Sequence, residues 1–198
     1  YGSYLAGYRF DLLDAHNKAV SAYLHALAVD PACALARARL GMRYALSDQI
    51  ERASEAMAEA EGAADNDPVA VALIGQYFSA HASRKAAHAF VQRNRSVLEQ
   101  TAAGMGVIGL HFLNIGNHDR AVAYLTKAMA FGPATLTLDF TLGMVYLHIG
   151  RIDLAADVFN RLVELRPDEP RYYCFLSSVY RRQGRLMEAI RVLRLART

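Results

Sequence analysis

The sequence predicts an all-α fold built from six consecutive helix–turn–helix repeats of 34 residues. The first observation is a column of small residues at intervals of 34, namely Gly7, Gly41, Gly75, Gly109, Gly143 and Ser177. The second is an aromatic residue three positions after each small one, and the third is an alanine twelve positions after it. Residues three positions apart lie on one face of a helix. The small residue therefore lets a second helix approach closely, and the aromatic fills the space beside it.

These columns stay in register over six copies with no insertion, which is the signature of a stacked repeat architecture. The aromatic column is Phe10, Tyr44, Phe78, Phe112, Tyr146 and Tyr180. The alanine column is Ala19, Ala53, Ala87, Ala121, Ala155 and Ala189. A fourth column, sixteen positions after the small residue, holds larger and mostly apolar residues: Tyr23, Met57, Val91, Leu125, Phe159 and Leu193.

The predicted repeats, in order, are residues 1–33, 34–67, 68–101, 102–135, 136–169 and 170–198, within a single domain over 1–198. Glycine suits the left-handed conformation in which many helices end. Tight turns are therefore expected after the first helix at Gly116–Asn117, Gly150–Arg151 and Gly184–Arg185. Proline cannot continue a helix. Second helices are therefore expected to end at Asp30–Pro31, Gly132–Pro133 and Arg166–Pro167.

The middle of the chain departs from this pattern. The second repeat lacks its closing proline, and Pro68 follows slightly later. The third repeat has Glu99 at the place of that proline, and the fourth begins with Gly104 and Gly106. Glycine inside a helix costs about 1 kcal/mol relative to alanine. We therefore expect the junction near residues 94–106 to be the weakest seam and a candidate hinge.

The pattern resembles the tetratricopeptide repeat, a helix–turn–helix unit of the same length. The copy over 136–169 matches most fully, with the family's residues at Gly143, Tyr146, Gly150, Ala155, Phe159 and Pro167. The resemblance covers the whole chain. It implies antiparallel helices stacked into a right-handed superhelical solenoid, with a concave and a convex face, in which each repeat contacts only its neighbours.

The resemblance also implies a binding site, because in this family the first helix of each repeat lines the concave groove. The groove would be aromatic at one end, apolar with methionine in the middle and basic at the other end, which suits a peptide or helix of another protein. In the alternative interpretation, several of these side chains are core residues, since apolar stripes at helical spacing usually are. The expected partner-binding residues are Tyr4, Tyr8, Met42, Gln76, Leu110, Asn114, Phe140, Met144, His148, Arg181 and Arg182.

Charge is distributed unevenly, although the net charge is only +3. Residues 170–198 hold seven arginines and a single acid, Glu188, so this end would attract a partner that is acidic in part. Some of these arginines would also suit the negative end of the last helix. Stacking aromatics are not interleaved among them, so no nucleic-acid partner is expected. No stretch of about 18 apolar residues occurs, so no membrane span is expected.

Sequence patterns that carry chemistry are weak. Residues 104–109 match the dinucleotide fingerprint G-x-G-x-x-G, but no strand precedes them and no acid lies about 20 residues on. The seven histidines show no metal-ligand spacing, and Cys33 and Cys174 are too far apart in sequence to form a ligand cluster. We therefore expect no cofactor, no metal and no enzyme activity.

These observations predict a non-catalytic adaptor, by analogy within a bacterial secretion, pilus or envelope assembly. The excess of 19 arginines over 3 lysines agrees with a GC-rich bacterial genome. One alternative is a sensor or oligomerisation module cut from a larger regulatory protein or enzyme. The absence of an initiator methionine and of the family's capping helix favours it, and uncapped terminal repeats would allow an oligomer. A second alternative is an enzyme in its own right. The cysteine usage favours the cytoplasm, and the periplasm stays open if a signal segment was removed.

Overall fold

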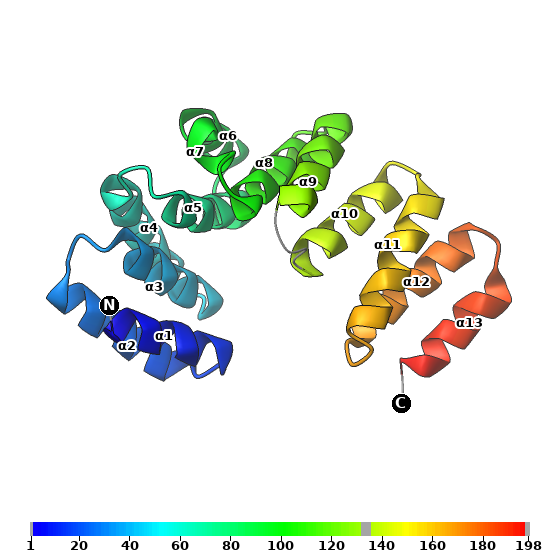
Figure 1. Cartoon of the computed structure of the whole chain (residues 1–198), viewed down its shortest axis with the longest axis horizontal. Coiled ribbons are helices and arrows are strands. Elements are labelled where there is room, and N and C mark those ends of the chain that lie inside the picture. Colours follow the sequence, from blue (N-terminus) through cyan, green and yellow to red (C-terminus); the bar gives the residue numbers. More distant parts are fainter. Residues whose placement is uncertain (1, 132–135, 197–198) are drawn as a thin grey trace. The chain divides into compact units, whose positions relative to one another are not determined.

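The computed structural model describes residues 2–131 and 136–196. Within this part of the chain there are 13 helices and no strand, so the expected all-α repeat fold is confirmed (Figure 1). The chain divides into two compact units, Tyr1–Val107 and Ile108–Thr198. Their boundary falls inside helix α8, next to the junction at 94–106 that the sequence singles out. None of the described helices is long and apolar enough to cross a membrane.

The first unit consists of helix pairs joined by short turns. Helices α1 and α2 pack side by side, as do α3 and α4 (Figure 1). The helices are α1 (Gly2–Leu12), α2 (His16–Val29), α3 (Ala34–Leu46), α4 (Ile50–Ala63), α5 (Pro68–His81), α6 (Arg84–Arg93), α7 (Arg95–Leu98) and the start of α8 (Ala102–Asn114).

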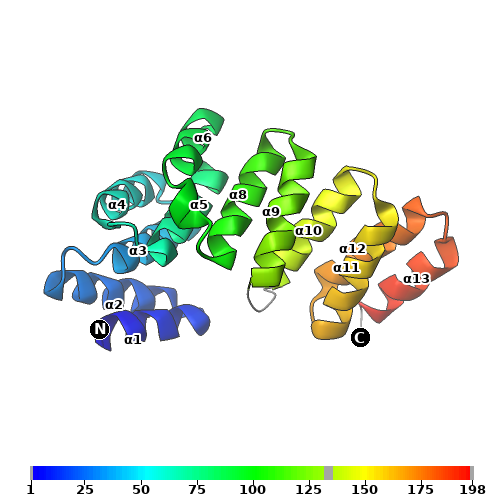
Figure 2. The ribbon, with the colours of Figure 1, turned by 45° about the horizontal axis from the view of Figure 1, so that its top comes forward.

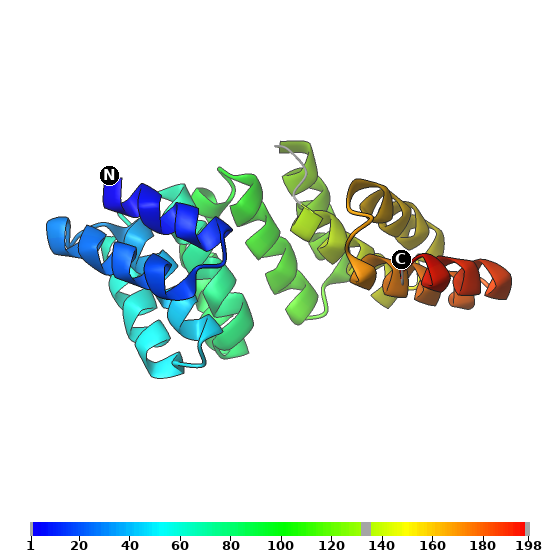
Figure 3. The same ribbon diagram turned by 90° about the horizontal axis from the view of Figure 1, so that it is seen from below.

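The second unit repeats this arrangement. Helices α10 and α11 pack together, α12 packs on α11, and α13 packs on α12 (Figures 2 and 3). The helices are the end of α8, then α9 (His118–Phe131), α10 (Leu136–His148), α11 (Ile152–Leu165), α12 (Pro170–Arg182) and α13 (Leu186–Leu195). The helix end expected at Gly132–Pro133 lies outside the described residues. The count of six repeats stays a prediction.

Two of the sequence columns meet in space. A Cβ atom built on Gly7 would lie 2.6 Å from the Cε1 atom of Tyr23, and one built on Gly143 would lie 2.9 Å from the Cζ atom of Phe159. The small residue of the first helix therefore faces the large residue sixteen positions later, on the second helix of the same repeat. The same relation holds for Gly41 with Met57 and for Gly109 with Leu125.

The alanine column forms the other half of this contact. All six alanines of the column are buried, and four of them are completely inaccessible to solvent. A larger side chain there would push the two helices of a pair apart, because packed interiors leave little free space. The four inaccessible residues are Ala19, Ala53, Ala121 and Ala155.

The turns within the pairs confirm the expected left-handed positions at Gly116, Gly150 and Gly184, where φ is 79°, 76° and 77°. The first unit places Asp14 and Asp48 at the corresponding positions, with φ of 51° and 58°. Aspartate tolerates this conformation better than most residues, because its short side chain can bond locally. In five turns the residue after the left-handed position donates its N–H to the carbonyl of the aromatic-column residue of the same repeat, as in a Schellman motif.

The third pair is where the fold departs from a regular repeat. Helix α6 ends at Arg93 and is capped by Asn94, whose side-chain amide donates to the carbonyl of Phe90 at 3.0 Å. The chain then forms the short helix α7, and the backbone of Leu98 presses against the start of α8. A Cβ on Gly104 would lie 2.7 Å from the Leu98 Cα atom. Gly104 thus has a packing role that outweighs its poor helix propensity.

Candidate partner-binding surface

All eleven residues expected to bind a partner lie on helices α1, α3, α5, α8, α10 and α12, which are the first helices of the predicted repeats. None of them is fully buried. The exposed ones are Tyr8, Gln76, Asn114, His148, Arg181 and Arg182. The half-buried ones are Tyr4, Met42, Leu110, Phe140 and Met144.

In the first unit, Tyr8 lies beside an ion-pair network that ties α1 to α3. The guanidinium carbon of Arg39 lies 4.8 Å from the centre of the Tyr8 ring. Asp11, whose side chain is only 6% exposed, forms an ion pair with Arg43, whose Nε lies 2.8 Å from Asp11 Oδ1. Its other oxygen, Oδ2, accepts a hydrogen bond from the hydroxyl of Tyr23 at 2.5 Å. Arginine can serve both interactions because its planar head stacks on rings and pairs with carboxylates.

This network keeps Tyr23 protonated. Burial raises the pKa of the Tyr23 hydroxyl, and the hydrogen bond to the Asp11 carboxylate raises it further. The tyrosine therefore acts as a neutral donor that satisfies a nearly buried acid. Sequence reasoning missed Asp11, Arg39 and Arg43. A signal was present, because the two arginines are four positions apart and so share a helix face.

Tyr4 is partly a packing residue and partly the wall of a cavity. Its ring centre lies 6.0 Å from that of Tyr23, and burial raises the pKa of its hydroxyl. The cavity has a volume of about 320 Å³ and lies where the loop from α2 to α3 meets the ends of α1 and α4. Cys33 and the acids Asp30 and Asp67 also line it.

In the second unit, Phe140 and Met144 belong mainly to the core. The Phe140 ring contacts Phe159, Tyr172 and Phe175 with centroid separations of 5.9, 5.9 and 5.0 Å. Met144 packs against the same buried cluster. A partner would reach only the edges of these two side chains, since apolar groups in such a cluster are already removed from water.

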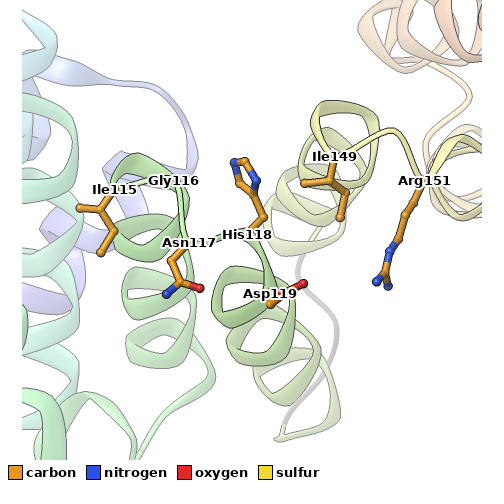
Figure 4. A pocket seen from close by; sticks show the side chains of 7 residues that line it. All are labelled: Ile115, Gly116, Asn117, His118, Asp119, Ile149 and Arg151. Atoms are coloured by element: carbon orange, nitrogen blue, oxygen red, sulfur yellow. The ribbon is translucent and has the colours of Figure 1, made fainter.

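His148 lies at the C-terminal end of α10, close to a surface depression. Its ring lies 4.9 Å from that of His118 in an edge-on arrangement. The depression has a volume of about 590 Å³ and is formed by the turn between α8 and α9 and the turn between α10 and α11. Figure 4 shows His118 between these turns, with Asp119 on one side and Arg151 across the depression.

The arginines at the C-terminal end of the chain differ in the hydrogen bonds and ion pairs that they form. Arg182 donates from Nη1 to the carbonyl of Leu147 at 2.9 Å, near the C-terminal end of α10, and this carbonyl also accepts the Gly150 N–H at 3.4 Å. Arg171 pairs with Glu169 at 2.9 Å, and this hydrogen bond lowers the pKa of Glu169. Arg185 pairs with Glu188 at 3.0 Å. Arg181 is exposed and makes no ion pair with any acid among the described residues. The free positive charge of this end is therefore smaller than the sequence count suggests.

The other motifs have structural roles. The glycines of residues 104–109 lie inside helix α8, where Gly104 faces Leu98 and Gly109 faces Leu125. His81 stacks on Tyr77 with ring centres 5.0 Å apart. In the part of the chain that the structure describes, no three His, Cys, Asp or Glu residues are grouped as metal ligands. Both cysteines are free thiols.

Known proteins share the repeat pattern of this chain. A family model described as the tetratricopeptide repeat matches residues 107–170 and 140–198. No curated protein matches the chain in sequence.

Among solved structures, the chain is similar to the Cut9–Hcn1 complex of the APC/C, with a TM-score of 0.84 and 15% identity. The match covers 96% of this chain and 38% of that one, so the chain spans well under half of its length. PilW, a type IV pilus biogenesis factor, is similar with a TM-score of 0.79 and 14% identity, over 96% of this chain and 88% of PilW. YrrB, described as having an unusual peptide-binding site, has a TM-score of 0.60 and 16% identity, over 89% and 91%. The repeat columns, the helix pairs and these matches agree, and together they support a tetratricopeptide repeat family for this chain.

Proposed function

We propose that this protein is a non-catalytic scaffold that binds a peptide or helix of a partner protein in the groove formed by its first helices. The fold supports the coarser statement that it is a protein–protein interaction scaffold. The observation that carries the finer proposal is that Gln76, His148 and Arg181 point polar groups into solvent from α5, α10 and α12. Exposed polar positions on rigid helices can form specific contacts without loss of packing.

The context we propose is a bacterial secretion, pilus or envelope assembly. PilW shares the fold, and a scaffold of this kind acts by holding components of an assembly together. The partner recovered in the experiment below names the pathway.

The test compares two triple variants. Gln76→Ala/His148→Ala/Arg181→Ala removes exposed side chains of first helices, and Glu55→Ala/Thr126→Ala/Asp157→Ala removes exposed side chains of second helices. Circular dichroism verifies that both fold. Partners are captured from the native organism, and the bound segment is measured as a synthetic peptide. We expect the first variant to lose about tenfold or more in affinity and the second to bind like the wild type. Equal binding by both variants would refute the groove.

A second candidate function is an oligomerisation or sensor module within a larger regulatory protein or enzyme. The observation that favours it is the apolar face of α13, where Leu186, Ile190 and Leu193 are 60%, 47% and 42% exposed. Their spacing places them along one side of the helix, and such a stripe is usually covered. Sedimentation velocity of the wild type and of Ile190→Glu tests this. A concentration-dependent dimer that the substitution abolishes supports the module, and a monomer in both cases counts against self-association.

A further inference from the structure

The cavity beside Tyr4 lies within the first unit and has walls of two kinds. One wall is apolar and is formed by Ala26, Val29 and Leu35 together with small side chains of α3 and α4. The rim is acidic, because Asp30 and Asp67 both line the cavity. Its volume of about 320 Å³ is at the lower end of the range for ligand sites in proteins. Such a space suits one long side chain and the backbone that carries it.

The two rim acids each accept one backbone hydrogen bond. Asp30 accepts a hydrogen bond from the Ala32 N–H at 3.1 Å, and Asp67 accepts one from the Val69 N–H at 2.9 Å. Each of these bonds uses only Oδ1 of the acid. Neither acid forms an ion pair with a described basic residue, so Oδ2 of each can accept a further donor.

Arg37 and Arg39 make their polar contacts elsewhere and form no ion pair with Asp30 or Asp67. Arg37 pairs with Glu59 and donates its other terminal nitrogen to the carbonyl of Pro31 at 2.6 Å. Arg39 stacks on Tyr8 and lies 3.9 Å from the carboxylate of Asp11. Among the described residues that line the cavity there is no lysine or arginine. The site is therefore an apolar space with two carboxylates that form no ion pair with a described residue, and its chemical complement is a cation on an apolar stem.

We propose that this cavity receives a lysine or arginine side chain of the partner segment, with its stem against Val29 and Leu35 and its charged head at Asp30 and Asp67. The inference rests on the proposed function, since it assigns one anchor of the bound segment.

The cavity contains its own reporter, because Cys33 lines it and becomes the only thiol in a Cys174→Ser background. The experiment measures the rate at which maleimide modifies Cys33 while Nα-acetyl-lysine methylamide is titrated at constant ionic strength. When the probe concentration equals its dissociation constant, half of the sites are occupied and the rate falls about twofold. The matched norleucine compound, which has the same stem without the charge, is expected to protect much less.

Charge variants separate specific binding from general attraction. Asp30→Asn/Asp67→Asn keeps both backbone hydrogen bonds, because asparagine also accepts them, and removes two charges. Asp48→Asn/Glu55→Gln removes two charges from exposed acids of the same unit that do not line the cavity. Protection by the lysine probe should vanish in the first variant and persist in the second. Equal protection by the norleucine compound, or undiminished protection in Asp30→Asn/Asp67→Asn, would overturn the proposal.

A second measurement distinguishes failure of this inference from failure of the proposed function. The synthetic partner peptide is titrated against wild type, Asp30→Asn/Asp67→Asn and the triple variant of Gln76, His148 and Arg181. Loss of about tenfold in affinity in the charge variant supports the cavity as an anchor site. If only the triple variant loses affinity, the groove stands and the cavity proposal is wrong. If neither variant loses affinity, both are wrong.

Discussion

The contact between Gly143 and Phe159 makes a sharp prediction about stability. Gly143 lies in the interior of α10, where alanine would normally be preferred by about 1 kcal/mol. A methyl group there would lie 2.9 Å from the Phe159 Cζ atom and 3.1 Å from a Val158 methyl carbon. The effect of Gly143→Ala therefore depends on whether Phe159 can move.

The surroundings of Phe159 leave it little room. The ring is completely buried and stacks on Phe175 with centroids 5.5 Å apart, while Phe140 meets it edge-on at 5.9 Å. Inserting a methyl group into such a core costs about 1 to 3 kcal/mol. The helix-propensity gain offsets part of this cost. We therefore expect Gly143→Ala to lower the free energy of unfolding by about 1 kcal/mol.

Two other glycines supply controls. At Gly62, in α4, a Cβ meets nothing within 4 Å, so Gly62→Ala should stabilise by about 0.5 kcal/mol. At Gly41 the nearest atom is the terminal Cε of Met57 at 3.0 Å, and a methionine tail can move aside. Gly41→Ala should therefore fall between the other two variants.

Urea unfolding followed by circular dichroism measures all three variants, with the slope of the transition checked for each. Phe159→Leu in the Gly143→Ala background provides a double-mutant cycle, with an expected favourable coupling of about 1 kcal/mol. The reasoning fails if Gly143→Ala is as stable as the wild type, or if the cycle shows no coupling.

Three further predictions concern other parts of the fold. Arg182→Ala should lower the unfolding free energy by about 1 kcal/mol in urea titrations, because the Leu147 carbonyl loses one of its hydrogen-bond donors. Arg181→Ala is the control and should have no measurable effect on the unfolding free energy. Gly104→Ala should lower the free energy of unfolding by about 3 kcal/mol or displace α7, because its methyl group would collide with the Leu98 backbone. Hydrogen exchange of the amides of residues 95–98 distinguishes these two outcomes. A variant with unchanged stability and unchanged exchange would contradict the contact. The pKa of Tyr23 is raised on folding, so its contribution to stability is complete below its unfolded pKa of about 10 and falls as the pH rises above it. Tyr23→Phe should therefore make unfolding free energy less dependent on pH between about 9 and 11, and an unchanged slope would contradict the assignment.

The candidate surface could be predicted only in outline. The sequence placed all eleven expected residues on first helices, and the structure agrees. It could not separate exposed positions such as Gln76 and His148 from Phe140 and Met144, which pack into the core. All lie on helices with the same apolar periodicity, and whether a side chain meets a neighbouring helix depends on how the pairs pack.

The sequence by itself determined the helix pairs, the position of the turns, and the columns of small and large residues. These features repeat every 34 residues and depend on helix periodicity, on glycine and proline conformations, and on contacts between neighbours in the chain. Only the tertiary structure decided the rest: the role of Gly104 beneath α7, the Asp11 network, and the acidic cavity lined by Tyr4, Asp30 and Asp67. The first joins two helices, and the other two each bring together residues from three or more helices or turns, in a geometry set by packing that no local sequence pattern encodes.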